Sequence, residues 1–436
     1  MNQTVAIQTE KYWFPILPQG WKTGRIKDVY NQISNSGSQL DEGTYIPLEN
    51  LESFTGRLIQ RVNNENNETT NLFRKGDILL NKLRPYLAKV HLVEFDGGVS
   101  GEVVVLRNSS IWKKNTSNRY FFYRFLSSAF INKINSMSEG VKMPRTNPSK
   151  ILALEIAIPS LDEQIAIAQY LDTKTQAIDK KVSLLEKKIG YYQELRKSLI
   201  NETVTKGLDK NVELKTNELG FDTPKNWLRY RLKDLGALYS GLSGKSGDDF
   251  NQDDNPDNKG FIPFTNIANN TYLKRDHLGT VVVNEGEKQN RVRKGDIFFL
   301  MSSEGYEDIG KTAALAEDIE ETYLNSFCKG YRVNPRKTNP YFLNYLMLSD
   351  YYRQLLIVEG KGFTRINLKM EKVNDFLVYI PDTLSAQEEI VKFLDAKLGT
   401  IAKIITNIQT QITTLKELRK TLINDVVTGK IKVSHE

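Results

Sequence analysis

The feature that most constrains this chain is a long apolar repeat that runs from residue 161 to residue 205. Its members recur at alternating steps of four and three residues, at Leu171, Ile178, Val182, Leu185, Ile189, Tyr192 and Leu199, with Thr175 and Arg196 in the two gaps. This heptad pattern is typical of a helix that packs along a second helix. At ~1.5 Å per residue the helix is roughly 65 Å long, which is more than the core of a compact domain needs. The sequence therefore predicts a partner helix.

The partner helix is predicted in the same chain. Residues 384–428 repeat residues 161–205 after a shift of 223 positions, and 18 of the 45 positions are identical. The apolar positions recur in the same register, at Leu394, Leu398, Ile401, Ile405, Ile408, Ile412, Leu415 and Leu422. A repeat of this length indicates that one unit, a globular domain followed by a long helix, is duplicated.

The stretches before the two helices repeat only at landmarks. The segment KGDI at 75–78 recurs at 294–297, and the glycine-led loop GVKMPRTN at 140–147 is matched with GKGFTRIN at 360–367. Scaffold residues that recur between unlike stretches predict two copies of one fold with different targets. In the first copy, short apolar segments predict strands at 78–80, 88–93, 101–107 and 151–158, and aromatic residues at helical spacing predict a helix over 119–130.

The order of the parts is domain, helix, domain, helix. The second domain begins where the first helix ends and finishes where the second helix starts. Parallel helices would separate these two points by roughly 65 Å, whereas antiparallel helices bring them together, as the termini of a domain usually are. The expected fold class is therefore α+β: two similar mixed α/β domains separated by two long helices that form an antiparallel coiled coil, a pseudo-two-fold dumbbell. The expected bounds are 1–158 for the first domain, 159–207 for its helix, 208–380 for the second domain, 381–430 for its helix and 431–436 for a tail.

Charge is distributed unevenly along the chain. The net charge is +7, but residues 1–160 carry 20 basic and 14 acidic side chains, whereas residues 207–383 carry 24 basic and 26 acidic ones. A positive excess on one domain suggests a polyanionic partner. The single cysteine, Cys328, excludes an intramolecular disulfide, which fits a reducing cytoplasm. No run approaches 18 apolar residues, so no membrane span is expected.

These parts in this order resemble the specificity subunit of type I restriction–modification systems, over roughly residues 15–430. The residues that carry the resemblance are Lys75-Gly76-Asp77-Ile78-Leu79, Pro159 with Asp162-Glu163-Gln164, Gln387-Glu388, and the segments ELRKSLIN and ELRKTLIN near the ends of the two helices. The resemblance implies two target-recognition domains, each of which binds half of a split double-stranded DNA site in a bacterial or archaeal cytoplasm. It also implies that the paired helices hold two methyltransferase subunits, which bind S-adenosylmethionine, and that two restriction/translocase subunits can join them. One departure is Ala386, which stands where the first copy has an acidic residue before the glutamine.

Three segments partly match motifs for methyl transfer, phosphate binding or metal binding, but none has the spacing that the motif requires. The segment Asn339-Pro340-Tyr341-Phe342 has one proline where an adenine methyltransferase has two, and is interpreted as a turn before a helix. Gly244-Lys245-Ser246 resembles the end of a phosphate-binding loop, but Tyr239 occupies the position of that loop's first glycine. The aspartates between 248 and 257 lack the spacing of a calcium loop, and the three histidines are scattered. We therefore expect no catalytic, cofactor-binding or metal-binding residue in this chain.

Basic residues in the predicted loops are the candidates for contact with DNA. In the first domain they are Lys82, Arg84, Lys142 and Arg145, and in the second domain they are Lys245, Arg291, Arg293, Lys361 and Arg365. Arginine and lysine can bridge guanine O6 and N7 or neutralise phosphate. Arg145 and Arg365 are the strongest candidates, because the two matched loops place them at corresponding positions.

The sequence thus predicts a non-catalytic reader of DNA sequence that recruits a methyltransferase and, with it, a nuclease. Two alternatives remain open. In one, the partner is only a methyltransferase, and in the other the chain is a coiled-coil scaffold that joins two protein-binding domains. The basic loops and the divergent duplicated domains favour DNA.

If the helices act as a ruler, lengthening one of them should change the spacing of the DNA site. An insertion of four residues near Lys187 adds about one turn, or ~6 Å, and DNA rises ~3.4 Å per base pair. The gap between the half-sites should therefore grow by one or two base pairs while the half-sites stay the same. Site mapping of the insertion variant measures this gap, and an unchanged gap in a folded protein contradicts the ruler.

Overall fold

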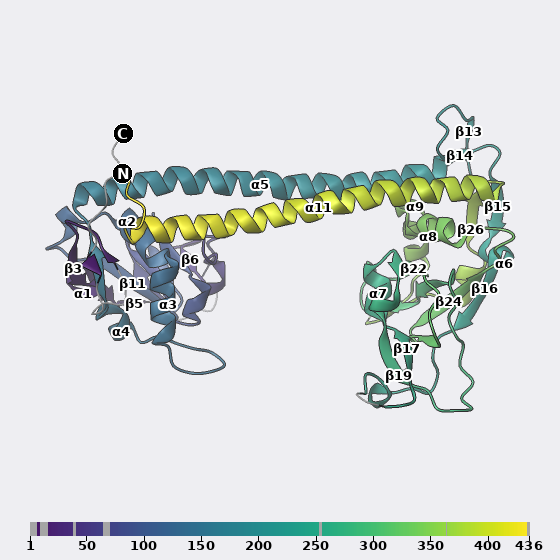
Figure 1. Cartoon of the computed structure of the whole chain (residues 1–436), viewed down its shortest axis with the longest axis horizontal. Helices are drawn as coiled ribbons and strands as arrows, with labels where there is room; N and C mark the ends of the chain where they lie inside the picture. The colour runs from purple at the N-terminus through teal and green to yellow at the C-terminus, as the bar shows by residue number, and fades with distance from the viewer. Residues whose placement is uncertain are drawn as a thin grey trace. The chain divides into compact units, whose positions relative to one another are not determined.

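Two long helices, α5 (Leu161–Lys206) and α11 (Leu384–Val427), run through the structure, a computed structural model that describes residues 7–8, 16–37, 41–63, 70–252, 255–362 and 364–433. Compared with the repeated stretches 161–205 and 384–428, both helices begin at the same residue and end within one residue, whereas the expected bounds 159–207 and 381–430 extend up to three residues further at each end. The chain forms two units, the first of Met1–Lys187 with Ile408–Glu436 and the second of Lys188–Asn407. Each unit contains a globular part and a section of both helices (Figure 1).

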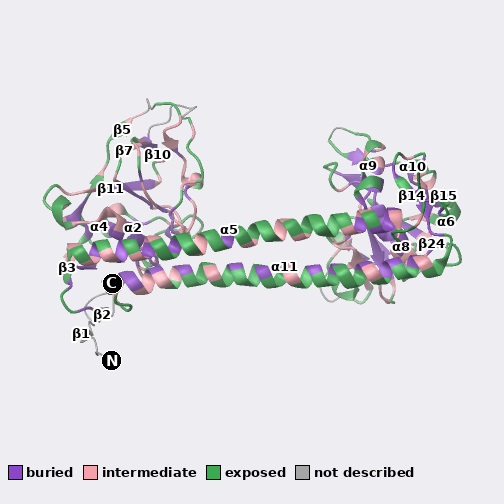
Figure 2. Ribbon diagram, turned by 90° about the horizontal axis from the view of Figure 1, so that it is seen from above, coloured by how far each residue is buried: buried purple, intermediate pink, exposed green. Residues whose placement is uncertain are grey.

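Within each unit the two helices pack in opposite directions. In the first unit Asp179 lies 3.0 Å from Arg419 and Glu186 lies 3.5 Å from Lys416, so residue numbers rise along α5 as they fall along α11. In the second unit the end of α5 shares a core with the start of α11. The predicted seam residues are mostly buried or half-buried, whereas most other positions of the helices are exposed (Figure 2). The predicted antiparallel pairing is therefore confirmed inside each unit.

The first unit is built from short strands and helices around two sheets. Its elements are β1 (Ile7–Gln8), β2 (Ile16–Leu17), β3 (Lys22–Arg25), α1 (Ile26–Val29), β4 (Tyr30–Ile33), β5 (Ser36–Gly37), β6 (Tyr45–Ile46), η1 (Leu48–Asn50), β7 (Thr70–Phe73), β8 (Ile78–Asn81), η2 (Pro85–Leu87), β9 (Val90–Leu92), β10 (Gly97–Val99), β11 (Val103–Asn108), η3 (Lys113–Asn115), α2 (Asn118–Leu126), α3 (Ser128–Ser136), α4 (Pro148–Leu152) and β12 (Glu155–Ile158). The strand orders are β4-β11-β8-β9 and β5-β7-β10-β6, and β12 pairs with β3.

The second unit has a similar plan, with one five-stranded and one three-stranded main sheet. Its elements are β13 (Leu214–Thr216), β14 (Asp222–Pro224), β15 (Leu228–Arg231), α6 (Leu232–Leu235), β16 (Gly236–Ser240), η4 (Gly247–Asp249), β17 (Asn258–Ile262), α7 (Phe264–Asn269), β18 (Tyr272–Leu273), η5 (Arg275–His277), β19 (Gly279–Val282), β20 (Ile297–Leu300), β21 (Ser302–Ser303), β22 (Thr312–Leu315), β23 (Thr322–Leu324), β24 (Cys328–Val333), α8 (Pro340–Leu348), α9 (Asp350–Val358), β25 (Ile366–Asn367), α10 (Met370–Asn374) and β26 (Leu377–Ile380). The orders are β16-β24-β20-β22-β18 and β19-β17-β23, with β15 paired to β26 and β21 to β25.

Each main sheet is covered on both faces. In β8, Ile78 and Leu80 join the core beneath the helices, whereas Leu79 joins the core shared with the second sheet. In β20, Phe298 and Phe299 divide in the same way. Side chains alternate across a strand, so a strand covered on both faces is apolar throughout. This explains the continuous apolar run that predicted the strand at 78–80.

Two of the sequence-based boundaries were wrong, each because of a helix cap. The predicted helix 119–130 divides at Ser127, whose hydroxyl accepts a hydrogen bond from the Phe130 N–H and starts α3. The predicted strand 151–158 is a strand only from Glu155, because Asn147 caps α4 and Pro148 occupies its first turn.

A buried glutamine fastens the globular part of each unit to its long helix. The Gln164 side chain accepts a hydrogen bond from the N–H of Ser117, the N-cap of α2, and donates one to the Pro159 carbonyl, at 2.9 and 3.0 Å. Gln387 does the same for Asn339, the N-cap of α8, and for Pro381, at 2.8 and 3.0 Å. Both glutamines are 1% exposed.

The residue before each glutamine gives the two units different contacts. The Glu163 carboxylate accepts a hydrogen bond from the Trp21 indole at 3.0 Å. Ala386 has no polar side chain with which to form the same bond to Trp227. The expected local difference at Ala386 is therefore the loss of one tryptophan contact, while the glutamine bonds persist.

Replacement of either glutamine should destabilise its own unit. Gln164→Ala and Gln387→Ala each leave a buried N–H and a buried carbonyl without their partner, at ~1–3 kcal/mol per group. Unfolding in urea is monitored by hydrogen exchange, which reports on the two units separately. It measures the loss in the free energy of unfolding of each unit. Gln193→Ala, at an exposed position of α5, is the matched control. Equal stability of Gln164→Ala and this control would contradict the role of the clamp.

Candidate nucleic-acid interface

Two further contacts hold each globular part on the helices. The Tyr123 hydroxyl donates to Asp172 of α5 at 2.7 Å, and the Tyr345 hydroxyl donates to Asp395 of α11 at 2.6 Å. Burial raises the pKa of Tyr123 to about 12, so it remains a donor at neutral pH. The start of α3 also donates to Asn424, and that of α9 to the repeated residue Asn201.

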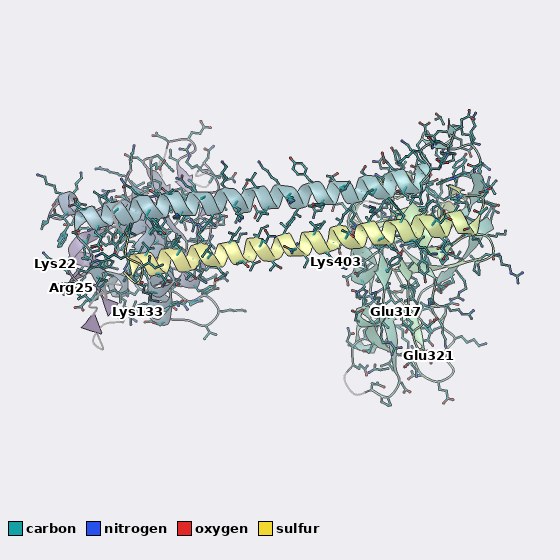
Figure 3. All side chains as sticks on the ribbon, turned by 45° about the horizontal axis from the view of Figure 1, so that its top comes forward. Lys22, Arg25, Lys133, Glu317, Glu321 and Lys403 are labelled. Atoms are coloured by element: carbon teal, nitrogen blue, oxygen red, sulfur yellow. The ribbon has the colours of Figure 1, made fainter. Side chains whose placement is uncertain are left out.

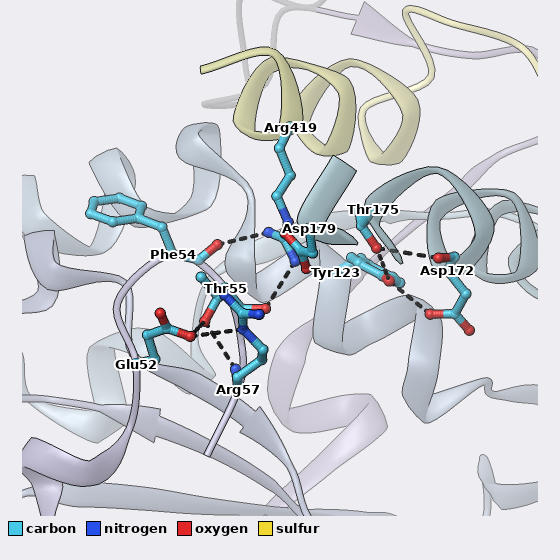
Figure 4. Close-up of polar contacts among 9 residues, drawn as sticks. All are labelled: Glu52, Phe54, Thr55, Arg57, Tyr123, Asp172, Thr175, Asp179 and Arg419. Carbon is cyan, nitrogen blue, oxygen red and sulfur yellow. Dashed lines mark hydrogen bonds and ion pairs between the residues drawn. The ribbon is translucent and has the colours of Figure 1, made fainter. Parts of the chain in front are cut away.

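One attachment differs between the two units. Arg419 of α11 donates to the carbonyls of Phe54 and Thr55 at 2.9 and 3.0 Å, and its Nε lies 3.0 Å from Asp179 (Figure 4). Its repeat, Arg196, is exposed and donates to the Thr271 hydroxyl. Ala402 occupies the position that matches Asp179. Arg419 therefore fixes the 52–57 loop of the first unit against both helices.

The four basic candidates of the first unit lie on two loops that run side by side. The Thr146 N–H donates to the Lys82 carbonyl at 2.9 Å, and the Arg84 N–H donates to the Pro144 carbonyl at 2.7 Å. The loop that carries Lys142 and Arg145 is closed by backbone bonds between Glu139 and Arg145. The structure thus brings Lys82, Arg84, Lys142 and Arg145 to one region.

The second of these loops is rigid at its base. Gly140 has φ +93°, which favours glycine, and the Thr146 hydroxyl donates to the Ile134 carbonyl of α3 at 2.9 Å. The Arg145 guanidinium forms an ion pair with Glu102 at 2.7 Å, yet its side chain stays 57% exposed. Arg145 is thereby held in place while most of its surface is free to meet a ligand.

The sequence-based candidates omitted two apolar side chains at the tip of this loop. Val141 is fully exposed and Met143 is 51% exposed. The signal was present in the sequence, because Val141 and Met143 stand between a glycine and a proline in a segment too short for a strand.

The predicted pairing of Arg145 with Arg365 was wrong by two residues. Backbone bonds between Lys361 and Asn367 repeat those between Glu139 and Arg145, and the Leu368 N–H donates to Met301 as the Thr146 N–H does to Lys82. Gly362, at φ +144°, therefore matches Gly140. Arg145 corresponds to Asn367, and Arg365 corresponds to Met143. A turn that needs a positive φ sets this register, and the identity of single letters had suggested another.

The candidates of the second unit lie in different settings. The Arg365 guanidinium lies 4.7 Å from the centre of the Phe327 ring, whose residue is 48% exposed. Lys361, at the base of the same loop, is exposed, as is Arg293. The Arg291 guanidinium pairs with Glu321, and its hydrogen bond to Tyr323 raises the pKa of the arginine.

Lys245 is not available to a ligand. Its side chain is 6% exposed and its ammonium lies 2.7 Å from Glu287. The hydrogen bond from Lys245 is the main cause that holds the pKa of Glu287 below its usual value. The assignment of Lys245 to DNA binding is therefore corrected to a structural ion pair.

The recurring KGD segment also has a structural role. Asp77 receives two hydrogen bonds from Arg107 of β11, and Asp296 receives two from Arg332 of β24. Both aspartates are 2% exposed. They fix the start of β8 and β20, and so the strands from which the candidate loops leave.

The two surfaces differ in charge. Residues 1–160 carry 20 basic and 14 acidic side chains, whereas residues 207–383 carry 24 basic and 26 acidic ones. Figure 3 labels Lys22 and Arg25 of the first unit, and Glu317, Glu321 and Lys403 of the second. Within the described ranges, no group of three His, Cys, Asp or Glu side chains is placed to hold a metal ion; Asp253 and Asp254 lie outside them. The same ranges contain no helix that is long and apolar enough to cross a membrane.

Comparison with known proteins gives one consistent family. The family model "Type I restriction modification DNA specificity domain" matches residues 18–187 and 224–414. The chain is 23% identical over 443 residues to the "Type I restriction enzyme MjaVIII specificity subunit" of Methanocaldococcus jannaschii, covering 96% of this chain and 95% of that protein. It is 27% identical over 168 residues to the EcoDI specificity subunit of Escherichia coli, covering 36% and 35%.

Two solved structures share the fold. A chain described under "Structural basis underlying complex assembly and conformational transition of the type I R-M system" has a TM-score of 0.73 at 17% identity, covering 95% of this chain and 99% of that one. The HsdS subunit of Thermoanaerobacter tengcongensis has a TM-score of 0.55 at 17% identity, covering 95% and 98%.

The Lys245 ion pair allows a direct test. Lys245→Met should lower the melting temperature, because Glu287 loses its partner, and the double variant with Glu287→Gln should recover part of the loss. The difference from the wild type should shrink as the pH falls and Glu287 becomes protonated, since the depressed pKa stabilises the fold only while the carboxylate is charged. DNA affinity of the folded variants should be unchanged. Weaker DNA binding by a Lys245→Met protein of unaltered stability would restore Lys245 to the interface.

Proposed function

This chain belongs to the family of type I restriction–modification specificity subunits, and we propose that it reads a split double-stranded DNA site, one half-site with each unit. The observation that carries the proposal is the contrast between scaffold and loops. Buried contacts recur in both units, as with Gln164 and Gln387, whereas the exposed loop tips carry different side chains. Two copies of one scaffold with different exposed tips suit two different half-sites.

The first unit has the net positive charge that attracts the phosphates of DNA. Its globular region carries an excess of six positive charges, and its candidate loops expose Lys142 and Arg145. Contacts with phosphate position a protein on DNA, and contacts with base edges give specificity. In the second unit, where acidic residues slightly outnumber basic ones, Arg365 and Lys361 supply the contacts on one loop.

The helices are proposed to hold the methyltransferase. Leu184, Tyr191 and Leu195 of α5 recur at steps of seven and four, which places them on one face of the helix, and they are 57%, 75% and 45% exposed. A row of large exposed apolar side chains is typical of a protein-binding surface. Catalysis and S-adenosylmethionine binding then belong to the methyltransferase subunits, and cleavage to restriction/translocase subunits where these join.

Selection of duplexes by the complex of this chain with its methyltransferase tests the proposal. Binding should weaken steeply as salt rises, because phosphate contacts release counterions. Arg145→Ala should weaken recognition of one half-site by ~1–3 kcal/mol and leave the other intact. Arg25→Ala is the matched control, because Arg25 is also an exposed arginine paired with a carboxylate in the first unit.

The outcomes separate the parts of the proposal. If neither half-site responds to Arg145→Ala, the loop is not in the interface. If the complex selects no DNA sequence, the chain does not read DNA, and a scaffold joining protein-binding domains becomes the better account.

A further inference from the structure

Building on the proposed function, we infer that the apolar tip at residues 140–144 reads thymine, with Val141 and Met143 in contact with C5-methyl groups in the major groove. The inference adds two side chains to the interface that charge alone does not indicate. It also names the chemical feature of the first half-site that they recognise.

The shape of the loop suits the groove. The backbones of Glu139 and Arg145 are joined by two hydrogen bonds of 2.8 and 2.9 Å, an isolated bridge that closes residues 140–144 into a narrow loop. The major groove is ~12 Å wide and admits an α-helix or a two-stranded ribbon, so a closed loop of five residues also fits. In Figure 1 the segment that follows α3 extends on the side of the first unit that faces away from α5 and α11. The tip is therefore free to enter a groove while the base stays fixed.

The side chains of the tip suit a thymine methyl. Val141 is fully exposed and Met143 is 51% exposed, although the same loop buries Thr146 to 1%. Binding is favoured when apolar side chains leave water and contact an apolar surface. In the major groove, the C5-methyl of thymine is the apolar group that base edges present. Lys142 between them and Arg145 at the base supply the charge that attracts the DNA backbone.

The matched loop of the second unit serves as an internal comparison. Met143 corresponds to Arg365, which stacks on Phe327, and Lys142 corresponds to Thr364. The backbone hydrogen bonds and the glycine with positive φ recur, but the guanidinium of Arg365 replaces the thioether of Met143. An arginine suits guanine O6 and N7 rather than a methyl group, so Arg365 should read a guanine at the position where Met143 meets a methyl group.

Replacement of thymine by deoxyuridine tests the inference, because it removes only the C5-methyl. Each thymine of the first half-site is replaced in turn, and binding by the complex of the full chain with its methyltransferase is measured by fluorescence anisotropy. At least one replacement should weaken wild-type binding about fourfold, which corresponds to the ~0.8 kcal/mol of one buried methylene-sized group.

Variants of the tip connect this effect to the two residues. The double variant Val141→Ala with Met143→Ala should bind the thymine duplex more weakly and no longer distinguish it from the deoxyuridine duplex. Ile111→Ala is the matched control, because Ile111 is an apolar residue of the same unit with 84% exposure, in the segment between β11 and η3. This control should keep the full distinction between the two duplexes.

Three results would overturn the inference while leaving the proposed function intact. They are a selected first half-site without thymine on either strand, wild-type binding that no deoxyuridine replacement weakens, and a double variant that still distinguishes the duplexes. Absence of any sequence-specific binding would instead overturn the proposed function, and the inference with it.

Discussion

The rest of the structure depends on two buried glutamines, Gln164 and Gln387. Each joins the first turn of a domain helix to the chain just before a long helix, through bonds of nearly equal length in the two units. A buried amide that satisfies two backbone groups tolerates little displacement, because an unpaired buried group costs about as much as a lost hydrogen bond. The globular part of each unit is thus held in one orientation on the helix that it precedes.

A fixed scaffold allows the exposed loops to differ. The aspartates Asp77 and Asp296 pin the strands, and the glycines Gly140 and Gly362 turn the loops, so these residues recur. The side chains at 141–143 and at 364–365 are exposed, so they can change at little cost to stability, whereas Ile366 beside them is buried. A fixed scaffold with variable exposed loops suits a protein in which the recognised sequence changes while the assembly is kept.

The sequence predicted those parts of the fold that local patterns determine. The repeated heptad stretches 161–205 and 384–428 matched both long helices within one residue, and the apolar run at 78–80 predicted β8, because burial on both faces leaves a continuous signal. Contacts between distant residues were not predictable. Lys245 was assigned to DNA because nothing near it in the sequence indicated Glu287, 42 residues away. The match of Arg145 with Arg365 failed because the positive φ of Gly362 sets the register of its loop.

The central claim is that each unit reads its own half-site through its exposed tip. The most direct test replaces the first tip, at 140–144, with the sequence at 362–366, and maps the methylated sites of the complete complex on genomic DNA. The account predicts that one half of the methylated motif changes while the other half and the gap between them stay the same. A motif that is unchanged, or one in which both halves change together, would contradict it.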